Sequence, residues 1–143
     1  MQRKDWTLLA INAANGKGLS AVQLQKVLFL LEQGVPTEVG DSYYNFKPYN
    51  YGPFDPLVYE DARRLATKNL VNISSPFGQR YNVYSITPEG VEKAIELEHQ
   101  VPPRAVRHLN EVVSWVKSVT FGELLRAIYS NYPDMKANSV FTF

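Results

Sequence analysis

Apolar residues recur at helical spacing in the first third of the chain, which predicts two helices. The first covers residues 5–15 and stops before Gly16, with one apolar stripe made of Trp6, Leu9, Ala10 and Ala13. The second covers residues 20–33, where Ser20 followed by Gln23 forms a capping-box pattern. Its apolar stripe consists of Leu24, Val27, Leu28 and Leu31.

The period of the pattern changes between residues 55 and 90. A helix is predicted over 55–69, with Asp55 as N-cap and Pro56 at the first helical position. Two β-prone runs follow within 71–86 and are joined by turn residues, and Thr87 with Pro88 opens a further helix. A helix followed by a β-hairpin is the outline of the recognition helix and wing of a winged helix.

Two more amphipathic helices are predicted near the end of the chain, over 104–119 and 121–132, and Thr120 with Glu123 caps the second. Pro102 and Pro103 separate them from the preceding helix. We therefore expect an α+β, mainly helical fold. It would be a single winged helix-turn-helix domain over 1–143, with a core over 1–100 and a C-terminal helical extension over 103–137.

The composition of the chain excludes several classes of functional site. The chain has 143 residues, 45% of them hydrophobic, and no cysteine, so disulfides and thiolate metal sites are excluded. No run of about 18 apolar residues or signal-peptide core is present, so we expect a cytoplasmic protein that does not enter membranes. His99 and His108 have no partner at metal-ligand spacing, and no nucleotide-binding or nucleophile pattern occurs. We expect no metal, no cofactor and no enzymatic activity.

One face of the helix over 55–69 is a candidate for DNA contact. Arginine is the commonest bidentate reader of guanine, and wing tips touch phosphate or the minor groove. The candidate DNA-binding residues are Arg63, Arg64, Thr67 and Lys68 on the helix, and Gln79 and Arg80 at the wing tip. The alternative is a solvated face held by a Glu60–Arg64 pair. Asp55, Glu60 and Asp61 would repel phosphate, and the net charge is only +1.

Aromatic residues are concentrated between residues 43 and 54. They fit either a stacking platform for a ligand or a set of tyrosines packed around a turn. They also fit a protein interface, because tyrosine and tryptophan are common at binding hot spots. The candidate protein-interaction residues are Tyr43, Tyr44, Tyr49, Tyr51 and Trp115.

Trp115 belongs to a second apolar stripe on the helix over 104–119, next to Val112 and Val119. One stripe can cover the core, and the other needs a partner. That partner is either the helix over 121–132 or a second copy of the chain. We expect a homodimer, which would also double the phosphate contacts on double-stranded DNA.

Residues 58–90 resemble the recognition helix and wing of PadR-type and MarR-type regulators. The resemblance is carried by Leu65, Asn69-Leu70-Val71, Arg80-Tyr81, Tyr84-Ser85-Ile86 and Thr87-Pro88-Glu89-Gly90. It implies the winged-helix fold and, less specifically, DNA binding.

A longer part of the chain resembles YwgA-like proteins and the related Panacea antitoxin domains. The resemblance is carried by Leu24-Gln25-Lys26-Val27-Leu28-Phe29-Leu30, Tyr51-Gly52-Pro53, Val58-Tyr59, Leu124-Leu125, Tyr129 and Tyr132-Pro133. Panacea domains are exchangeable, often phage-associated, toxin-neutralising modules. Two functions follow as expectations: a non-enzymatic winged-helix transcriptional regulator, or an interaction module that binds a cognate toxin or phage-defence protein without DNA.

Overall fold

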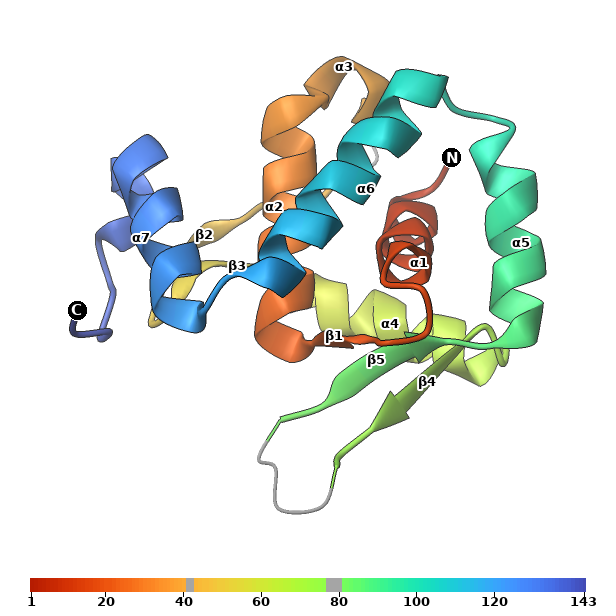
Figure 1. The fold of residues 1–143 in the computed structure, drawn as a ribbon, viewed down its shortest axis with the longest axis horizontal. Helices are drawn as coiled ribbons and strands as arrows, with labels where there is room; N and C mark the ends of the chain where they lie inside the picture. Colours follow the sequence, from red (N-terminus) through yellow and green to blue (C-terminus); the bar gives the residue numbers. More distant parts are fainter. Residues whose placement is uncertain (41–42, 77–80) are drawn as a thin grey trace.

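The computed structural model describes residues 1–40, 43–76 and 81–143 and has an α+β, mainly helical fold (Figure 1). Its first half contains α1 (Arg3–Ala13), β1 (Leu19–Ser20), α2 (Ala21–Gly34), α3 (Pro36–Val39), β2 (Lys47–Tyr49), β3 (Gly52–Phe54) and α4 (Leu57–Thr67). Its second half contains β4 (Val71–Ser74), β5 (Val83–Ile86), α5 (Pro88–Glu98), α6 (Pro103–Ser118), α7 (Phe121–Asn131) and the 3-10 helix η1 (Pro133–Lys136). The short elements α3 and η1 were not predicted from the sequence.

Both predicted capping boxes are present. The Ser20 hydroxyl accepts a hydrogen bond from the Gln23 backbone N–H at 3.2 Å, and the Gln23 side chain accepts one from the Ser20 N–H at 2.9 Å. Thr120 and Glu123 make the same reciprocal pair at the start of α7. Each box satisfies N–H groups that a helix start leaves unpaired, which explains why α2 and α7 begin where the sequence predicts.

The main sheet has three antiparallel strands in the order β1-β5-β4. The β4–β5 hairpin confirms the β-hairpin predicted within 71–86, with Val71 opposite Ile86 and Ile73 opposite Tyr84. The aromatic segment over residues 43–54 (the tyrosine segment) supplies none of these three strands, because the third strand is β1, where Leu19 lies opposite Tyr84.

The tyrosine segment instead forms its own hairpin, β2–β3, with Pro48 opposite Pro53. Proline has no backbone N–H, so neither residue could donate a hydrogen bond to a further strand. The segment therefore stays outside the main sheet.

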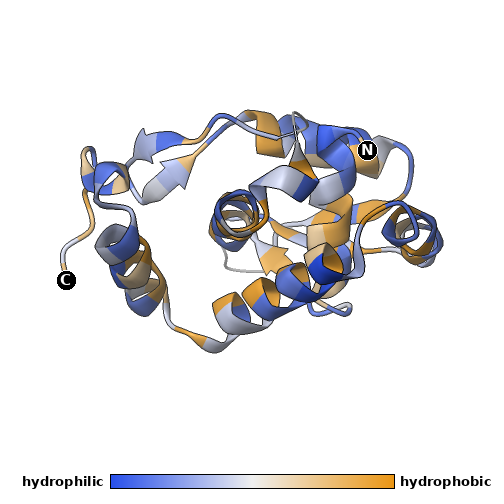
Figure 2. Cartoon of the chain, turned by 90° about the horizontal axis from the view of Figure 1, so that it is seen from above, coloured by the Kyte–Doolittle hydropathy of each residue, from blue (hydrophilic) through white to orange (hydrophobic). Residues whose placement is uncertain are grey.

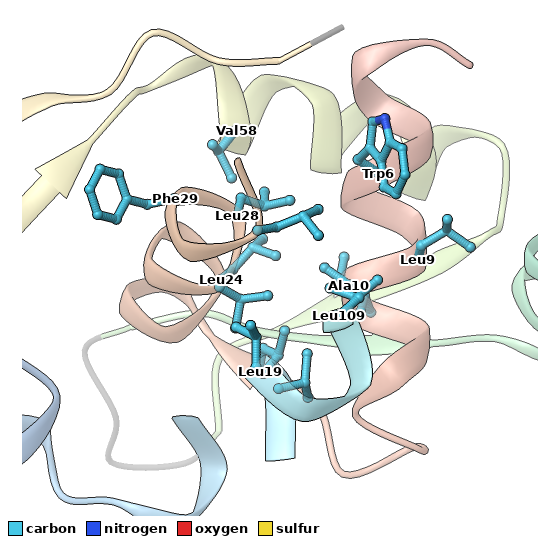
Figure 3. Close-up of a cluster of buried hydrophobic side chains, with 14 of the residues drawn as sticks. Trp6, Leu9, Ala10, Leu19, Leu24, Leu28, Phe29, Val58 and Leu109 are labelled. Atoms are coloured by element: carbon cyan, nitrogen blue, oxygen red, sulfur yellow. The ribbon is translucent and has the colours of Figure 1, made fainter. Parts of the chain in front are cut away.

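Helix α1 lies at the centre of the molecule, where Leu8, Ala10 and Ile11 are completely buried. Figure 3 shows side chains from α1, α2, α4 and α6 meeting around it, with Trp6 and Leu9 on α1 and Leu109 on α6 among those labelled. The bands of hydrophobic and hydrophilic colour along the helices in Figure 2 are those expected of amphipathic helices packed on one core. Helices α6 and α7 both contribute to this core, and α7 lies beside the β2–β3 hairpin (Figure 1).

Among the described residues, no helix has the length and apolar character needed to cross a bilayer.

Candidate functional site

The start of α4 is fixed by the buried residue Asp55. Its backbone N–H donates to Gln25 Oε1 at 3.0 Å, and Gln25 Nε2 donates back to the Asp55 carbonyl at 2.9 Å. One carboxylate oxygen accepts from the Leu57 N–H at 2.9 Å, and the other accepts from the Asn45 N–H at 2.8 Å. Asp55 therefore ties α4 to α2 and to the tyrosine segment, although the N-cap position itself is taken by Pro56.

A second buried carboxylate, Asp61, ties α4 to α1. The Arg3 guanidinium donates to it at 2.8 Å, and the Tyr44 hydroxyl donates to the same oxygen at 2.6 Å. The Tyr44 hydroxyl also lies 2.6 Å from the Thr7 hydroxyl, and the Arg3 guanidinium lies 4.9 Å from the centre of the Tyr44 ring. The hydrogen bond that Arg3 donates to Asp61 raises the pKa of Arg3, and burial raises the pKa of Tyr44.

These two carboxylates correct one expectation about charge. Asp55 and Asp61 were expected to repel phosphate, but they are only 5% and 2% exposed, and both accept hydrogen bonds from within the protein. The sequence held a signal for Asp61, because it shares the helical spacing of the buried residues Val58 and Leu65. Its burial leaves Glu60 as the exposed acid on this face of α4.

Four of the predicted DNA-binding residues are exposed on α4 or at its end: Arg63, Arg64, Thr67 and Lys68. Arg64 pairs with Asp61 at 3.6 Å, and the ion pairs of the described residues do not include the Glu60–Arg64 pair of the alternative interpretation. The Thr67 hydroxyl donates to the Arg63 carbonyl at 3.0 Å, so its proton is already used within the helix. The two arginines and Lys68 are left as the basic groups that face solvent.

The β4–β5 hairpin lies beside this helix. The Ser75 hydroxyl donates to the Asn82 side-chain oxygen at 2.8 Å and joins the two sides of the hairpin. Tyr81 is 46% exposed. Gln79 and Arg80, the predicted wing contacts, lie outside the described residues.

The predicted protein-interaction residues separate into two groups. Tyr43, Tyr49 and Tyr51 are 46%, 51% and 45% exposed, and Trp115 is 38% exposed. Tyr44 is only 4% exposed, so its assignment to an interaction surface is wrong. Its hydroxyl is held by Asp61 and Thr7, and that pairing allows the tyrosine to be buried.

A lysine that the site prediction did not include is buried between α2 and the β2–β3 hairpin. Lys26 is 2% exposed, and its Nζ donates to the Pro53 carbonyl at 3.1 Å. Burial lowers the pKa of Lys26 to about 7. Gly52, at a φ of +88°, lies so close that an added Cβ would be 3.4 Å from Lys26 Cε. The segments around Lys26 and Gly52 therefore pack directly against each other.

The described residues contain no group of three or more histidine, cysteine, aspartate or glutamate side chains that could hold a metal ion. Comparison of the chain with protein-family models, with curated proteins and with solved structures finds no match.

Proposed function

We propose that this protein is a winged-helix regulator that binds double-stranded DNA with α4 in the major groove. The observation that carries the proposal is the outer face of α4, where Arg63, Arg64 and Lys68 are exposed on a helix anchored from behind by buried hydrogen bonds. A rigid helix that presents arginines to solvent suits direct reading of base edges.

The order of elements supports this proposal. A helix, a short strand, two further helices and a β-hairpin follow one another, interrupted by α3 and the β2–β3 hairpin. The first strand closes the sheet next to β5. This is the arrangement expected of a winged helix, and it places the β4–β5 hairpin beside α4 (Figure 1).

A net charge of +1 is low for a protein that binds DNA, but the charge on the exposed face of α4 is more positive. Asp55 and Asp61 are buried. The exposed charges on α4 and at its end are therefore one negative side chain, Glu60, and three positive ones, Arg63, Arg64 and Lys68. A local basic cluster of this size supports a few phosphate or base contacts, which gives moderate affinity with a modest dependence on salt.

The first prediction concerns Arg63, which forms no ion pair with any residue that the structure describes. Duplexes selected from a random pool should bind the wild type. Arg63→Ala should weaken binding by roughly 1–3 kcal/mol, because a bidentate base contact is lost. Lys93→Ala is the matched control, because Lys93 is an exposed basic residue on α5. Fluorescence anisotropy at two salt concentrations measures both, and equal losses in the two variants would contradict a role for α4.

The second prediction is a homodimer through α6. The second apolar stripe of α6 is partly covered within the chain: Val112 is 9% exposed, and Trp115 is 38% exposed. Sedimentation equilibrium should show a wild-type dimer at tens of micromolar and a Trp115→Glu monomer, because the substitution places a charge in an apolar interface. A monomeric wild type would show that the contacts of α6 within its own chain are sufficient.

A second candidate function is an interaction module that neutralises a toxin or a phage-defence protein. The exposed rings of Tyr49, at the end of β2, and Tyr51, in the β2–β3 turn, favour it, because solvent-facing tyrosines are common at interface hot spots. Failure to select any duplex from the pool, combined with a stable complex formed with the product of an adjacent gene, would favour this function over DNA binding.

A further inference from the structure

The loop between α1 and β1 contains Asn15-Gly16, the one place in the sequence where glycine follows asparagine. Both residues are exposed, and apart from its chain neighbours nothing lies within 4 Å of the position that a Cβ on Gly16 would take. The Gly16 N–H donates to no described residue, whereas the N–H groups of both its neighbours donate to backbone carbonyls of α1 and its C-cap. The Gly16 nitrogen is therefore unpaired and open to water.

The turn that holds Asn15 can open at low cost. Asn15 has a φ of +52°, in the left-handed region that residues with side chains rarely adopt. The hydrogen bond from the Lys17 N–H to the Ala14 carbonyl, at 3.1 Å, closes the turn. Rotation about the Cα–C bond of Asn15 breaks that bond, but it leaves the bond from the Asn15 N–H to the Asn12 carbonyl in place. Glycine at position 16 puts no side chain in the way of this rotation.

We propose that Asn15 is a modification site that deamidates through a cyclic imide. The Gly16 nitrogen gives up its proton to the solvent and attacks the side-chain carbonyl carbon of Asn15. The new C–N bond closes a succinimide ring, and the side-chain nitrogen leaves as ammonia after taking a proton from water. A water molecule then opens the ring at either carbonyl and produces aspartate or isoaspartate. One water is consumed and one ammonia is released, with no change of oxidation state. The inference does not depend on DNA binding.

The modification would alter how the loop is held against β5. Lys117 Nζ donates to the Gly18 carbonyl at 2.6 Å, and an added Cβ on Gly18 would lie 2.8 Å from Val83 Cγ1. Isoaspartate puts an extra carbon into the backbone of a loop fixed at both ends, which should weaken the pairing of β1 with β5. The new carboxylate itself is favoured, because Asn15 lines a cleft with Lys17, Lys117 and no acidic residue. The aged protein should therefore unfold at a lower temperature than Asn15→Asp, which carries the same charge on an unaltered backbone.

Folded wild type kept in mildly alkaline buffer should lose the Asn15 amide, and peptide mapping by mass spectrometry identifies the residue. A synthetic peptide with the sequence of residues 10–20 provides the unfolded reference. Because opening the turn costs about one hydrogen bond, the folded protein should react within about tenfold of the peptide rate. An isoaspartate-specific methyltransferase with a labelled methyl donor should label the aged protein, because opening of the imide yields isoaspartate.

Asn138 is the internal control, because it is exposed and followed by the small residue Ser139. Its Nδ2 donates to the Pro48 carbonyl at 3.1 Å, and the Ser139 N–H donates to the Lys136 carbonyl at 2.9 Å, so it should keep its amide. Asn15→Gln should remove the methyl label, because its longer side chain closes an imide far more slowly. A folded rate more than about a hundredfold below that of the peptide would overturn the proposal. Conversion of Asn138 as fast as Asn15, or aspartate at position 15 without isoaspartate, would also overturn it. Equal unfolding temperatures of the aged protein and Asn15→Asp would overturn the effect on β1.

Discussion

Raising the pH from 7 to 10 should stabilise this protein, and Lys26→Met should abolish the effect. The unfolded chain holds the Lys26 proton up to the ordinary pKa of 10.5, whereas the folded protein releases it at about 7. Between these values the unfolded state binds more protons, so the free energy of unfolding rises with pH. The gain from pH 7 to 10 should be about 3 kcal/mol, taking 1.36 kcal/mol for each unit of pKa difference.

Other buried groups determine how stability changes with pH below pH 7 and above pH 10. Glu32 has its pKa raised to about 7, chiefly by burial, so its ionisation lowers stability between about pH 4.5 and 7 and adds no slope above that. Tyr44 and Tyr59 have pKa values raised above 10 by burial. The unfolded chain therefore loses tyrosine protons first at high pH, and stability falls again above about pH 10. The free energy of unfolding should thus pass through a minimum near neutral pH.

Lys26→Met keeps an unbranched side chain of similar length and removes the amine. At pH 7 the variant should be about 2 kcal/mol more stable than the wild type, because relief from charge burial exceeds the loss of the hydrogen bond to Pro53. At pH 10 the order should reverse, since the neutral amine donates that bond without a penalty. Urea unfolding at several pH values measures both effects.

Lys47→Met provides the control, because Lys47 is an exposed lysine on β2 of the adjacent hairpin. Its pH profile should run parallel to that of the wild type. A Lys26→Met profile that also ran parallel would show that the Lys26 amine keeps its proton in the folded protein.

The elements that depend on local sequence could be predicted. Ser20 and Thr120 determine where two helices begin, and the β-prone runs between Val71 and Ile86 form the expected hairpin. These features are determined by residues a few positions apart, which is the range that spacing and capping patterns describe. The exposure of Arg63 and Arg64 follows in the same way from the apolar stripe on the opposite face of α4.

The features that depend on distant contacts could not be predicted. Leu19 pairs with Tyr84, and Arg3 reaches Asp61 across 58 positions. Tyr44 looked like a surface residue because its sequence neighbours are polar or aromatic, but its hydrogen-bond partners come from α1 and α4. A polar residue can be buried where distant partners satisfy it, and spacing along the chain does not identify those partners.

Asp61→Asn should destabilise the protein by about 2–4 kcal/mol, although the side chain keeps its shape. One oxygen of Asp61 accepts from Arg3 Nε at 2.8 Å and from the Tyr44 hydroxyl at 2.6 Å. The other accepts from Arg3 Nη2 at 3.3 Å. An amide must place its NH₂ group at one of these positions, so in either orientation it faces an arginine N–H donor at a buried site. Glu60→Gln, an exposed substitution on the same helix, should change stability by less than about 0.5 kcal/mol.

A double-mutant cycle with Tyr44→Phe shows whether the network acts as a unit. Removing the Tyr44 hydroxyl from the wild type should cost about 1–2 kcal/mol, because its bond to a buried carboxylate is charge-assisted. In the Asp61→Asn background the same change should cost much less, since the charged acceptor is already gone. Equal costs in the two backgrounds would mean that the hydroxyl stabilises α1 through Thr7 alone. In that case Arg3 would be the main link between α1 and Asp61. Arg3→Met would then be the substitution that weakens the contact between α1 and α4.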